Sequence, residues 1–256
     1  MVTGDGRGTM AQDMDLGLRK LDRQPAAERI ADQLMAVIVE RKLDAGSLLP
    51  SEQQLSEMFG VSRPVIREAL RHLAALSIVD LAPGRRPRVR PLTDDLLRTF
   101  FEWALSLNQA SLLALHELRR GVEGESATLA AQRRSEEDVD RLRKVLEQMR
   151  ASLTDEDRYT ELDVEFHLEI AAAARNPLLV HLTASIRAPM ERTIRRGLRL
   201  ASGDSSELEV VQQDHERIVD AIATADPVRA RAAMDQHFDR AVARFVAAGV
   251  EAPGGQ

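Results

Sequence analysis

The chain has 256 residues, which is enough for two domains that each bury a hydrophobic core. Hydrophobic residues make up 44%, charged residues 30% and aromatic residues only 3%, a composition typical of a soluble, helix-rich protein. There is no cysteine, so disulfides and thiolate metal sites are excluded, and histidines and carboxylates remain as the strong metal ligands. The polar opening segment and the lack of a long apolar run exclude a signal peptide and a membrane span, and we expect a cytoplasmic protein.

Positive charge is concentrated in the first part of the chain, although the net charge is −6. Residues 1–92 carry 14 Lys and Arg against 12 Asp and Glu, whereas residues 93–256 carry 21 against 29. Within residues 61–90 there are seven arginines and two acidic residues. Because phosphate binding needs only a local basic face, the net charge does not exclude a DNA partner.

Residues 25–91 are predicted to form a winged helix-turn-helix, made of three helices and a small two-stranded wing. Ser51 and Ser62 stand where they would cap the second and third helices, and Gly60 lies in the turn between them. A turn around Gly84 joins the two strands of the wing. The predicted helices span 26–42, 51–58 and 62–76, and the predicted strands span 78–81 and 88–89.

Residues 93–249 are predicted to form an all-α antiparallel bundle of about seven helices, because a helical period runs through the region without a convincing strand. Asn176 and Asp226 precede prolines that mark helix starts, and Ser135 stands at a cap position. The segments 1–24 and 250–256 are expected to be flexible. The predicted helices span 94–106, 111–132, 135–153, 156–174, 177–200, 205–223 and 227–248.

Arginines on the third helix and in the wing are the candidate DNA contacts. Arg63 and Arg67 lie four residues apart on one helical face, and Arg71 follows one turn later. Near the start of a recognition helix such side chains can bind guanine bidentately. Arg85 and Arg86, at the tip of the wing, are expected to reach phosphates or the minor groove. The alternative for each arginine is a solvated side chain without a partner.

A run of residues in this region matches a known pattern: Leu49-Pro50-Ser51-Glu52, Leu55, Gly60 to Leu70, Leu73, Gly84 and Val89. The region resembles the winged helix-turn-helix of the GntR family of transcription regulators. The resemblance implies that Ser62, Arg63 and Arg67 contact DNA, and that Gly84 makes the tight turn of the wing. It also implies a homodimer on a palindromic operator. The candidate DNA-binding residues are Ser51, Ser62, Arg63, Arg67, Arg71, Gly84, Arg85 and Arg86.

Three positions depart from the pattern of the GntR family. Gln53 stands where arginine is common, and Ser77 stands where glycine is usual. The wing has Gly-Arg-Arg-Pro where Gly-x-Gly-Thr is commoner. The operator sequence of other members is therefore not transferred to this chain.

Four side chains on the later helices are candidate metal ligands. Asp163 and His167 are four residues apart, so on a helix they face the same side. His215 and His237 lie on the last two predicted helices, which antiparallel packing can bring together. Three histidines and one carboxylate suit a divalent ion, with Zn expected first and Ni or Mn as alternatives. The histidines that we interpret as ordinary interfacial residues are His72, His116 and His181.

The second domain also matches a known pattern: Glu117-Leu118-Arg119, Glu123, the alanine-rich 127–131, and Asp163, His167, His215 and His237. It resembles the FCD effector domain of FadR-type GntR regulators, in which the last four positions bind a metal. The resemblance implies that the metal helps to hold a small carboxylate, such as a sugar acid or hydroxy acid. Arg119 is a candidate counter-charge for this effector. The alternative is that Arg119 pairs with Glu123, one turn along the helix.

These predictions describe a sequence-specific regulator of transcription, expected to be a repressor, that a small organic acid controls. Effector binding would change how the two DNA-binding domains of a dimer are placed on the operator. In one alternative, the bundle is a dimerisation module with a purely structural metal. In another, the four ligands form a metalloenzyme site, which leaves the winged helix unexplained and lacks any accompanying catalytic motif, so we expect no enzyme.

Overall fold

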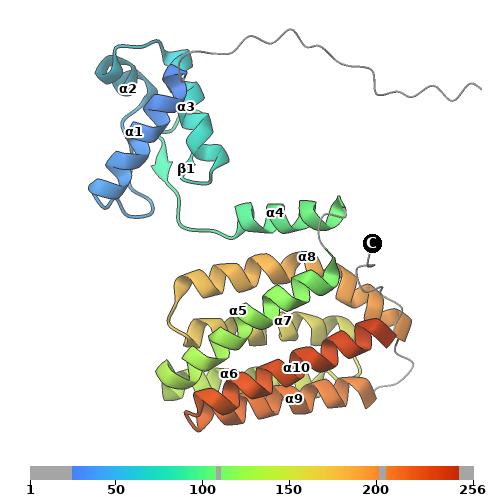
Figure 1. Ribbon diagram of the computed structural model, residues 1–256. Helices are drawn as coiled ribbons and strands as arrows, with labels where there is room; N and C mark the ends of the chain where they lie inside the picture. The colour runs from blue at the N-terminus through green and yellow to red at the C-terminus, as the bar shows by residue number, and fades with distance from the viewer. Residues whose placement is uncertain (1–24, 108–110, 202–205, 248–256) are drawn as a thin grey trace, which may run out of the picture. The chain divides into compact units, whose positions relative to one another are not determined.

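The computed structural model describes residues 25–107, 111–201 and 206–247 (Figure 1). It divides into two compact units between Leu92 and Thr93. The segments 1–24 and 250–256, which the sequence predicts to be flexible, lie outside the described residues. None of the described helices combines the length and the apolar character that a membrane span needs.

Three helices and two short strands form the first unit, which confirms the predicted winged helix-turn-helix. Its core is built from all three helices, with Leu34, Leu55, Ile66 and Leu70 among the buried side chains. Burial of these side chains leaves the opposite face of the third helix in solvent. The elements are α1 (Ala26–Glu40), α2 (Glu52–Phe59), α3 (Arg63–Ala75), β1 (Val79–Asp80) and β2 (Arg88–Val89).

The caps of α2 and α3 differ from each other. Ser51 makes the expected capping box, since its Oγ accepts from the Gln54 N–H (3.3 Å) and its own N–H donates to Gln54 Oε1 (2.9 Å). The expected side-chain cap by Ser62 is wrong: Ser62 holds the cap position without a side-chain hydrogen bond. Pro64 has no N–H to offer, and the Val65 N–H donates to the Ser62 carbonyl instead (3.1 Å).

A third extended segment, which the sequence pattern does not predict, pairs with the wing. β1 and β2 are antiparallel, with Val79 opposite Val89. Residues 46–49 run along the other side of β2, where the Gly46 N–H donates to the Val89 carbonyl and the Leu49 N–H to the Pro87 carbonyl, both at 2.8 Å. This short segment has no alternation of polar and apolar residues, so its pairing could not be read locally.

The described residues of the second unit form helices joined by short connections, without a strand, and the helices begin and end within two residues of the predicted bounds where these lie in the described part. α5 packs against α7 and α10, α9 lies beside α10, and α4 lies along α8 (Figure 1). The main core includes Leu142, Phe166, Ile218 and Phe238. The helices are α4 (Asp95–Ser106), α5 (Leu112–Arg133), α6 (Glu136–Ala151), α7 (Glu156–Ala173), α8 (Pro177–Ala201), α9 (Ser206–Ala223) and α10 (Pro227–Ala247).

The end of α3 generates a stability prediction at Ser77, where the family pattern has glycine. Ser77 has φ +58°, and the Ser77 and Ile78 N–H groups donate back to the carbonyls of Ala74 and Leu73 (both 2.9 Å), as in a Schellman motif. A side chain at this left-handed position is strained. We expect Ser77→Gly to stabilise the first unit by about 0.5–1 kcal/mol after the entropy cost of glycine.

Hydrogen exchange of the buried α3 amides checks this expectation, because protection should rise about 2- to 5-fold for that gain in stability. Ser77→Ala keeps the Cβ and should give no such gain. Equal protection in the Gly and Ala variants would contradict the strain at Ser77.

Candidate functional site

The exposed face of α3 carries the three arginines that the sequence assigned to DNA. Arg63, Arg67 and Arg71 are all exposed, whereas Ile66 and Leu70 on the other face are buried. The helical period of α3 therefore anchors one side in the core and presents a row of guanidinium groups on the other. Contact with DNA by these residues stays a prediction.

Arg67 is exposed, but it has a partner within the protein. Its Nε and Nη2 donate to the two carboxylate oxygens of Glu52, at 3.2 and 2.8 Å. Glu52 lies in the first turn of α2. The hydrogen bond from Arg67 lowers the pKa of Glu52, with further help from the charges of Arg67, Arg63 and Arg71. Both side chains are more than a third exposed, so the pair contributes at most about 1 kcal/mol and can open at little cost.

The two wing arginines are placed differently. Gly84 has φ +71°, the left-handed conformation that the predicted tight turn needs. Arg85 is exposed at the tip. The Arg86 Nε donates to the Leu49 carbonyl (2.9 Å), which ties this side chain to the segment before α2. Arg85 is thus the more available of the two for a phosphate.

The structure brings the four predicted metal ligands together inside the bundle. Nitrogens of His167 on α7, His215 on α9 and His237 on α10 lie within 4.8 Å of one another, and all three residues are buried. Asp163 Oδ1 lies 3.2 Å from His215 Nε2 and 3.7 Å from His167 Nε2. The i, i+4 spacing on α7 and the antiparallel packing of α9 and α10 produce this cluster.

This donor set fits a divalent ion. The Nδ1 atoms of His215 and His237 are buried and have no hydrogen-bond partner among the described residues, which is costly unless something else binds them. Burial and the charge of Arg187 lower the pKa of His167 to about 4, and burial with the neighbouring histidines lowers the pKa of His237. Neutral imidazoles are the form that binds metal, and three of them with one carboxylate suit Zn or a similar ion.

A network of two arginines and two carboxylates surrounds the histidines. The Arg119 Nε donates to Glu123 Oε1 (2.9 Å), so the alternative pairing of these residues is realised. Arg187 donates from Nε and Nη2 to Glu123 and from Nη1 to Asp163 Oδ2 (2.8 Å). Glu123 Oε2 also lies 2.5 Å from His167 Nδ1, where it can orient the ring. Burial opposes ionisation of Asp163 and Glu123, but the charge of Arg187 and the other cations outweighs it, and both pKa values lie well below the usual range.

Arg187 is the residue of this network that sequence reasoning missed. It lies on α8, 24 residues after Asp163 and 64 after Glu123. A usable indication exists in the sequence, because Arg187 interrupts the apolar spacing of Leu182, Ile186 and Met190. A charge on a buried helical face needs a partner, but the pattern alone does not say which.

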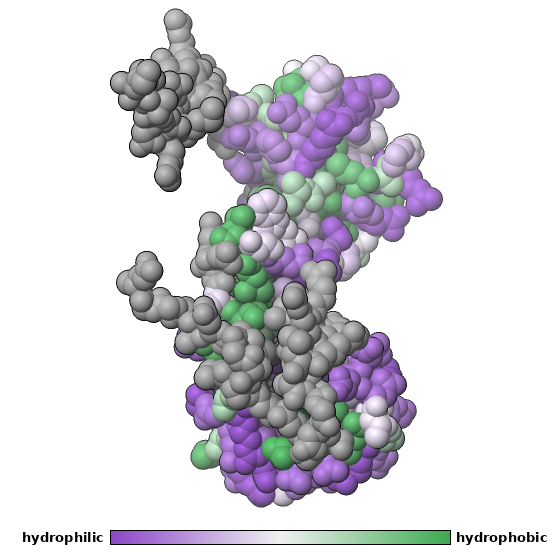
Figure 2. Space-filling view, turned by 90° about the vertical axis from the view of Figure 1, so that its right-hand side faces the viewer, coloured by the Kyte–Doolittle hydropathy of each residue, from purple (hydrophilic) through white to green (hydrophobic). Residues whose placement is uncertain are grey.

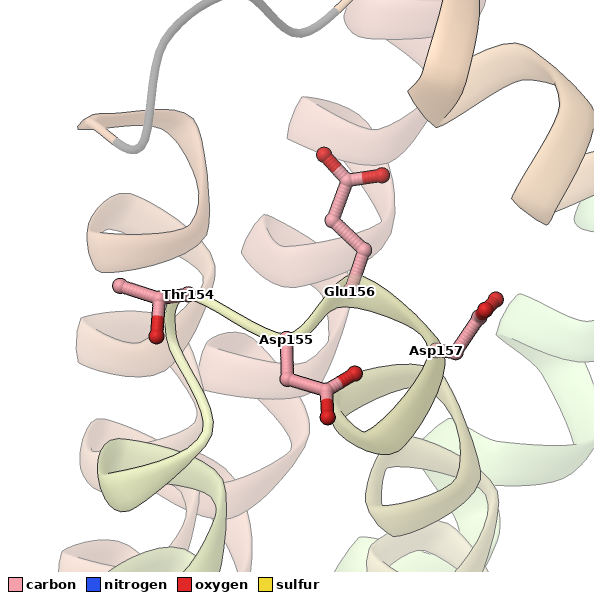
Figure 3. Close-up of a pocket in the computed structure, with 4 residues that line it drawn as sticks. All are labelled: Thr154, Asp155, Glu156 and Asp157. Atoms are coloured by element: carbon pink, nitrogen blue, oxygen red, sulfur yellow. The ribbon is translucent and has the colours of Figure 1, made fainter.

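A shallow depression at the turn between α6 and α7 is lined by Thr154, Asp155, Glu156 and Asp157 (Figure 3). Asp155 caps α7 by accepting from the Arg158 N–H. The carboxylates of Glu156 and Asp157 point in different directions in this view, so they do not converge as a ligand set. We therefore assign the depression no role.

Comparison with known proteins gives two family matches. Residues 26–89 match the model "Bacterial regulatory proteins, gntR family", and residues 114–240 match the model "FCD domain". The chain is 31% identical to the HTH-type transcriptional repressor NanR of Cronobacter sakazakii over 238 residues, which covers 91% of this chain and 90% of that protein. It is 32% identical to the HTH-type transcriptional regulator LutR of Bacillus subtilis over 204 residues, which covers 79% of this chain and 93% of that protein.

A solved structure shows the same fold. The Streptococcus agalactiae GntR structure matches with a TM-score of 0.58 and 26% identity, over 84% of this chain and 98% of that one. The matched length includes both a DNA-binding and a helical unit of the present chain.

The buried histidines generate a prediction for stability against pH. The unfolded chain takes up the His167 proton near its ordinary pKa of 6.5, and the folded chain only near 4. The contribution of His167 to stability is therefore full above about pH 6.5 and falls as the pH drops towards 4, by up to about 1.4 kcal/mol per pH unit. Asp163 and Glu123 act below this window, because their pKa values are lowered.

Urea unfolding of chelator-treated protein at pH 7 and pH 5 measures this effect. A His167→Gln variant should lose part of the dependence, whereas His72→Gln in the first unit should keep all of it. An unfolding midpoint that is the same at both pH values would show that His167 is not buried in the neutral form.

Proposed function

Because the chain belongs to the GntR family of bacterial regulatory proteins and carries an FCD domain, we propose a specific mode of control for this DNA-binding transcription regulator. It acts as a homodimeric repressor that binds a palindromic operator with Arg63, Arg67 and the wing. A small carboxylate, held at a divalent metal in the helical domain, sets its affinity for DNA. The metal ligands are Asp163, His167, His215 and His237.

The charge balance of the helical site supports an anionic effector, and this observation carries the proposal. The buried cations Arg119 and Arg187 are matched by the carboxylates Glu123 and Asp163, and the low pKa of His167 keeps its ring neutral. The site is therefore close to electroneutral before any ion binds. A divalent ion would add two positive charges to a buried site, and a carboxylate ligand would then be needed to compensate them.

Arg119 is the arginine with donors to spare. Arg187 uses all three of its guanidinium nitrogens on Glu123 and Asp163. Arg119 uses only Nε on Glu123, and its Nη1 makes a weak contact with the sulfur of Met190 (3.8 Å). The Phe238 ring lies 5.0 Å from its guanidinium carbon and helps to hold it in place. Arg119 can thus grip a carboxylate while it keeps its existing partner.

Packed side chains connect this site to α4, the first helix after the DNA-binding domain in the sequence. Arg187 lies on α8 between Ile186 and Met190, which form a cluster with Leu115 on α5. Phe101 of α4 packs on the same cluster. A ligand that shifts α8 by pulling on Arg187 or Met190 would therefore shift α4, and a coupling of about 1–3 kcal/mol is sufficient for control.

The role of Arg67 is tested by its replacement with alanine. We expect Arg67→Ala to weaken binding to DNA fragments that the wild-type protein selects from a random pool by about 5- to 150-fold, or 1–3 kcal/mol. Fluorescence anisotropy at fixed salt measures the loss. Arg29→Ala, an exposed arginine on α1, is the matched control for charge and should cost much less. Equal losses in both variants would mean that Arg67 contributes only general electrostatics.

The metal and effector are tested by thermal unfolding against a panel of sugar acids, hydroxy acids and dicarboxylates, with and without chelator. We expect one class of acid to raise the melting temperature of the metal-loaded protein only. His215→Ala should lower bound metal and abolish that shift, whereas His181→Ala should leave both unchanged. Metal that stays bound while no acid shifts the melting temperature would favour the alternative of a structural metal.

A further inference from the structure

A single guanidinium group, that of Arg187, holds both of the predicted metal ligands on α7. Its Nη1 donates to Asp163 Oδ2 at 2.8 Å and to the Asp163 carbonyl at 3.2 Å. Its Nε and Nη2 donate to the carboxylate of Glu123 at 3.2–3.3 Å. Glu123 Oε2 in turn lies 2.5 Å from His167 Nδ1. Arg187 therefore contacts Asp163 directly. It reaches His167 only through Glu123.

The two carboxylate oxygens of Asp163 face different groups. Oδ2 accepts the hydrogen bond from Arg187, whereas Oδ1 lies 3.2 Å from His215 Nε2 and 3.7 Å from His167 Nε2. A guanidinium group on Oδ2 competes with a metal ion for that oxygen, and its positive charge repels a cation placed there. Oδ1 is therefore the oxygen that is left for an ion between the histidines.

We propose that Arg187 is a positioning residue that restricts Asp163 to a single metal-binding oxygen. The protein then supplies one oxygen and one nitrogen from each of the three clustered histidines. Any further position around the ion is left to water or to an added ligand. This inference rests on the metal site of the proposed function, and it names the residue that sets which ions the site prefers.

Burial makes the contact between Arg187 and Asp163 hard to break. Hydrophilic residues cover most of the described surface of the second unit in the view of Figure 2, whereas the side chains of Arg187 and Glu123 are only 3% and 2% exposed. Little water can reach Arg187 to replace a lost hydrogen bond. If Oδ2 moved away, a charged N–H group would stay buried without a partner, which is costly. Oδ2 is thus expected to stay on Arg187 when an ion binds.

The second buried arginine does not share this role. Arg119 Nε donates to Glu123 Oε1 at 2.9 Å, and its Nη1 contacts the sulfur of Met190. Among the described residues, none of the hydrogen bonds of Arg119 reaches Asp163. The restriction of Asp163 therefore depends on Arg187 alone.

The restriction has a consequence for the choice of ion. Three imidazoles and one carboxylate oxygen are a complete ligand set for Zn²⁺. Mn²⁺ prefers oxygen ligands in an octahedral arrangement, so a second carboxylate oxygen matters more to it. With Oδ2 kept by Arg187, the site should favour Zn²⁺ over Mn²⁺ more strongly than it would with both oxygens of Asp163 available.

Arg187→Lys tests the restriction, because lysine keeps the buried positive charge but lacks the planar group that holds two carboxylates at once. Competition with a chelating dye measures Zn²⁺ affinity, and the electron paramagnetic resonance signal of free Mn²⁺ measures Mn²⁺ affinity. We expect the Zn²⁺ affinity to fall about 10- to 100-fold, as when other residues that orient metal ligands are replaced. The Mn²⁺ affinity should fall less, so that the preference for Zn²⁺ drops by roughly 5-fold or more, because Oδ2 becomes available to the ion.

The matched control is Arg141→Lys on α6. Arg141 also contacts two carboxylates, those of Asp138 and Glu169, but it lies outside the histidine cluster. The control should leave both metal affinities unchanged. Equal losses of Zn²⁺ and Mn²⁺ affinity in Arg187→Lys would overturn the restriction, and they would leave the metal of the proposed function standing. A wild-type protein that binds neither ion would overturn both.

A crystal structure of the zinc-loaded wild-type protein tests the same point without relying on the folding of a variant. We expect one oxygen of Asp163 on the ion and the other on Arg187. Both oxygens on the ion, or an Arg187 side chain turned away from Asp163, would overturn the inference.

Discussion

The packing of the second unit depends on a group of buried charged side chains that neutralise one another. Arg187 spans from Glu123 on α5 to Asp163 on α7, and Arg119 completes the neutralisation of Glu123. Each charge is costly in a helical interior on its own, and the loss of one partner leaves another uncompensated. The network therefore fixes how α5, α7 and α8 are placed, and it positions the α7 histidine beside those of α9 and α10.

The same network makes the site suited to control. The Nδ1 atoms of His215 and His237 are buried without a hydrogen-bond partner among the described residues, while the surrounding arginines and carboxylates already balance one another. In the proposed function, a metal would bind the histidines and add positive charge, and a carboxylate would compensate that charge. Arg187 lies on α8 next to Ile186, whose cluster packs against Phe101 of α4, so in the proposed function a change at the site would reach α4.

In the first unit, local contacts add to the hydrophobic core. The capping box at Ser51, the left-handed Gly60 and the wing turn at Gly84 each depend on neighbours within a few residues. Its long-range polar contacts hold arginines in place: Glu52 holds Arg67, and the Leu49 carbonyl holds Arg86. These contacts partly order Arg67 and Arg86, and in the proposed function this order would lower the entropy cost of binding DNA.

The helices and their ends could be predicted from the sequence, whereas contacts between side chains far apart in the sequence could not. Helical period, proline after Asn176 and Asp226, and the serine caps predicted the helices closely, and the i, i+4 pair Asp163 and His167 predicted a shared face. The partners of Arg187 and the hydrogen bond of Arg86 depend on segments tens of residues apart. A periodic pattern states that a helix face is apolar or charged. Only the packing of the other helices decides whether that face is buried, paired or left exposed.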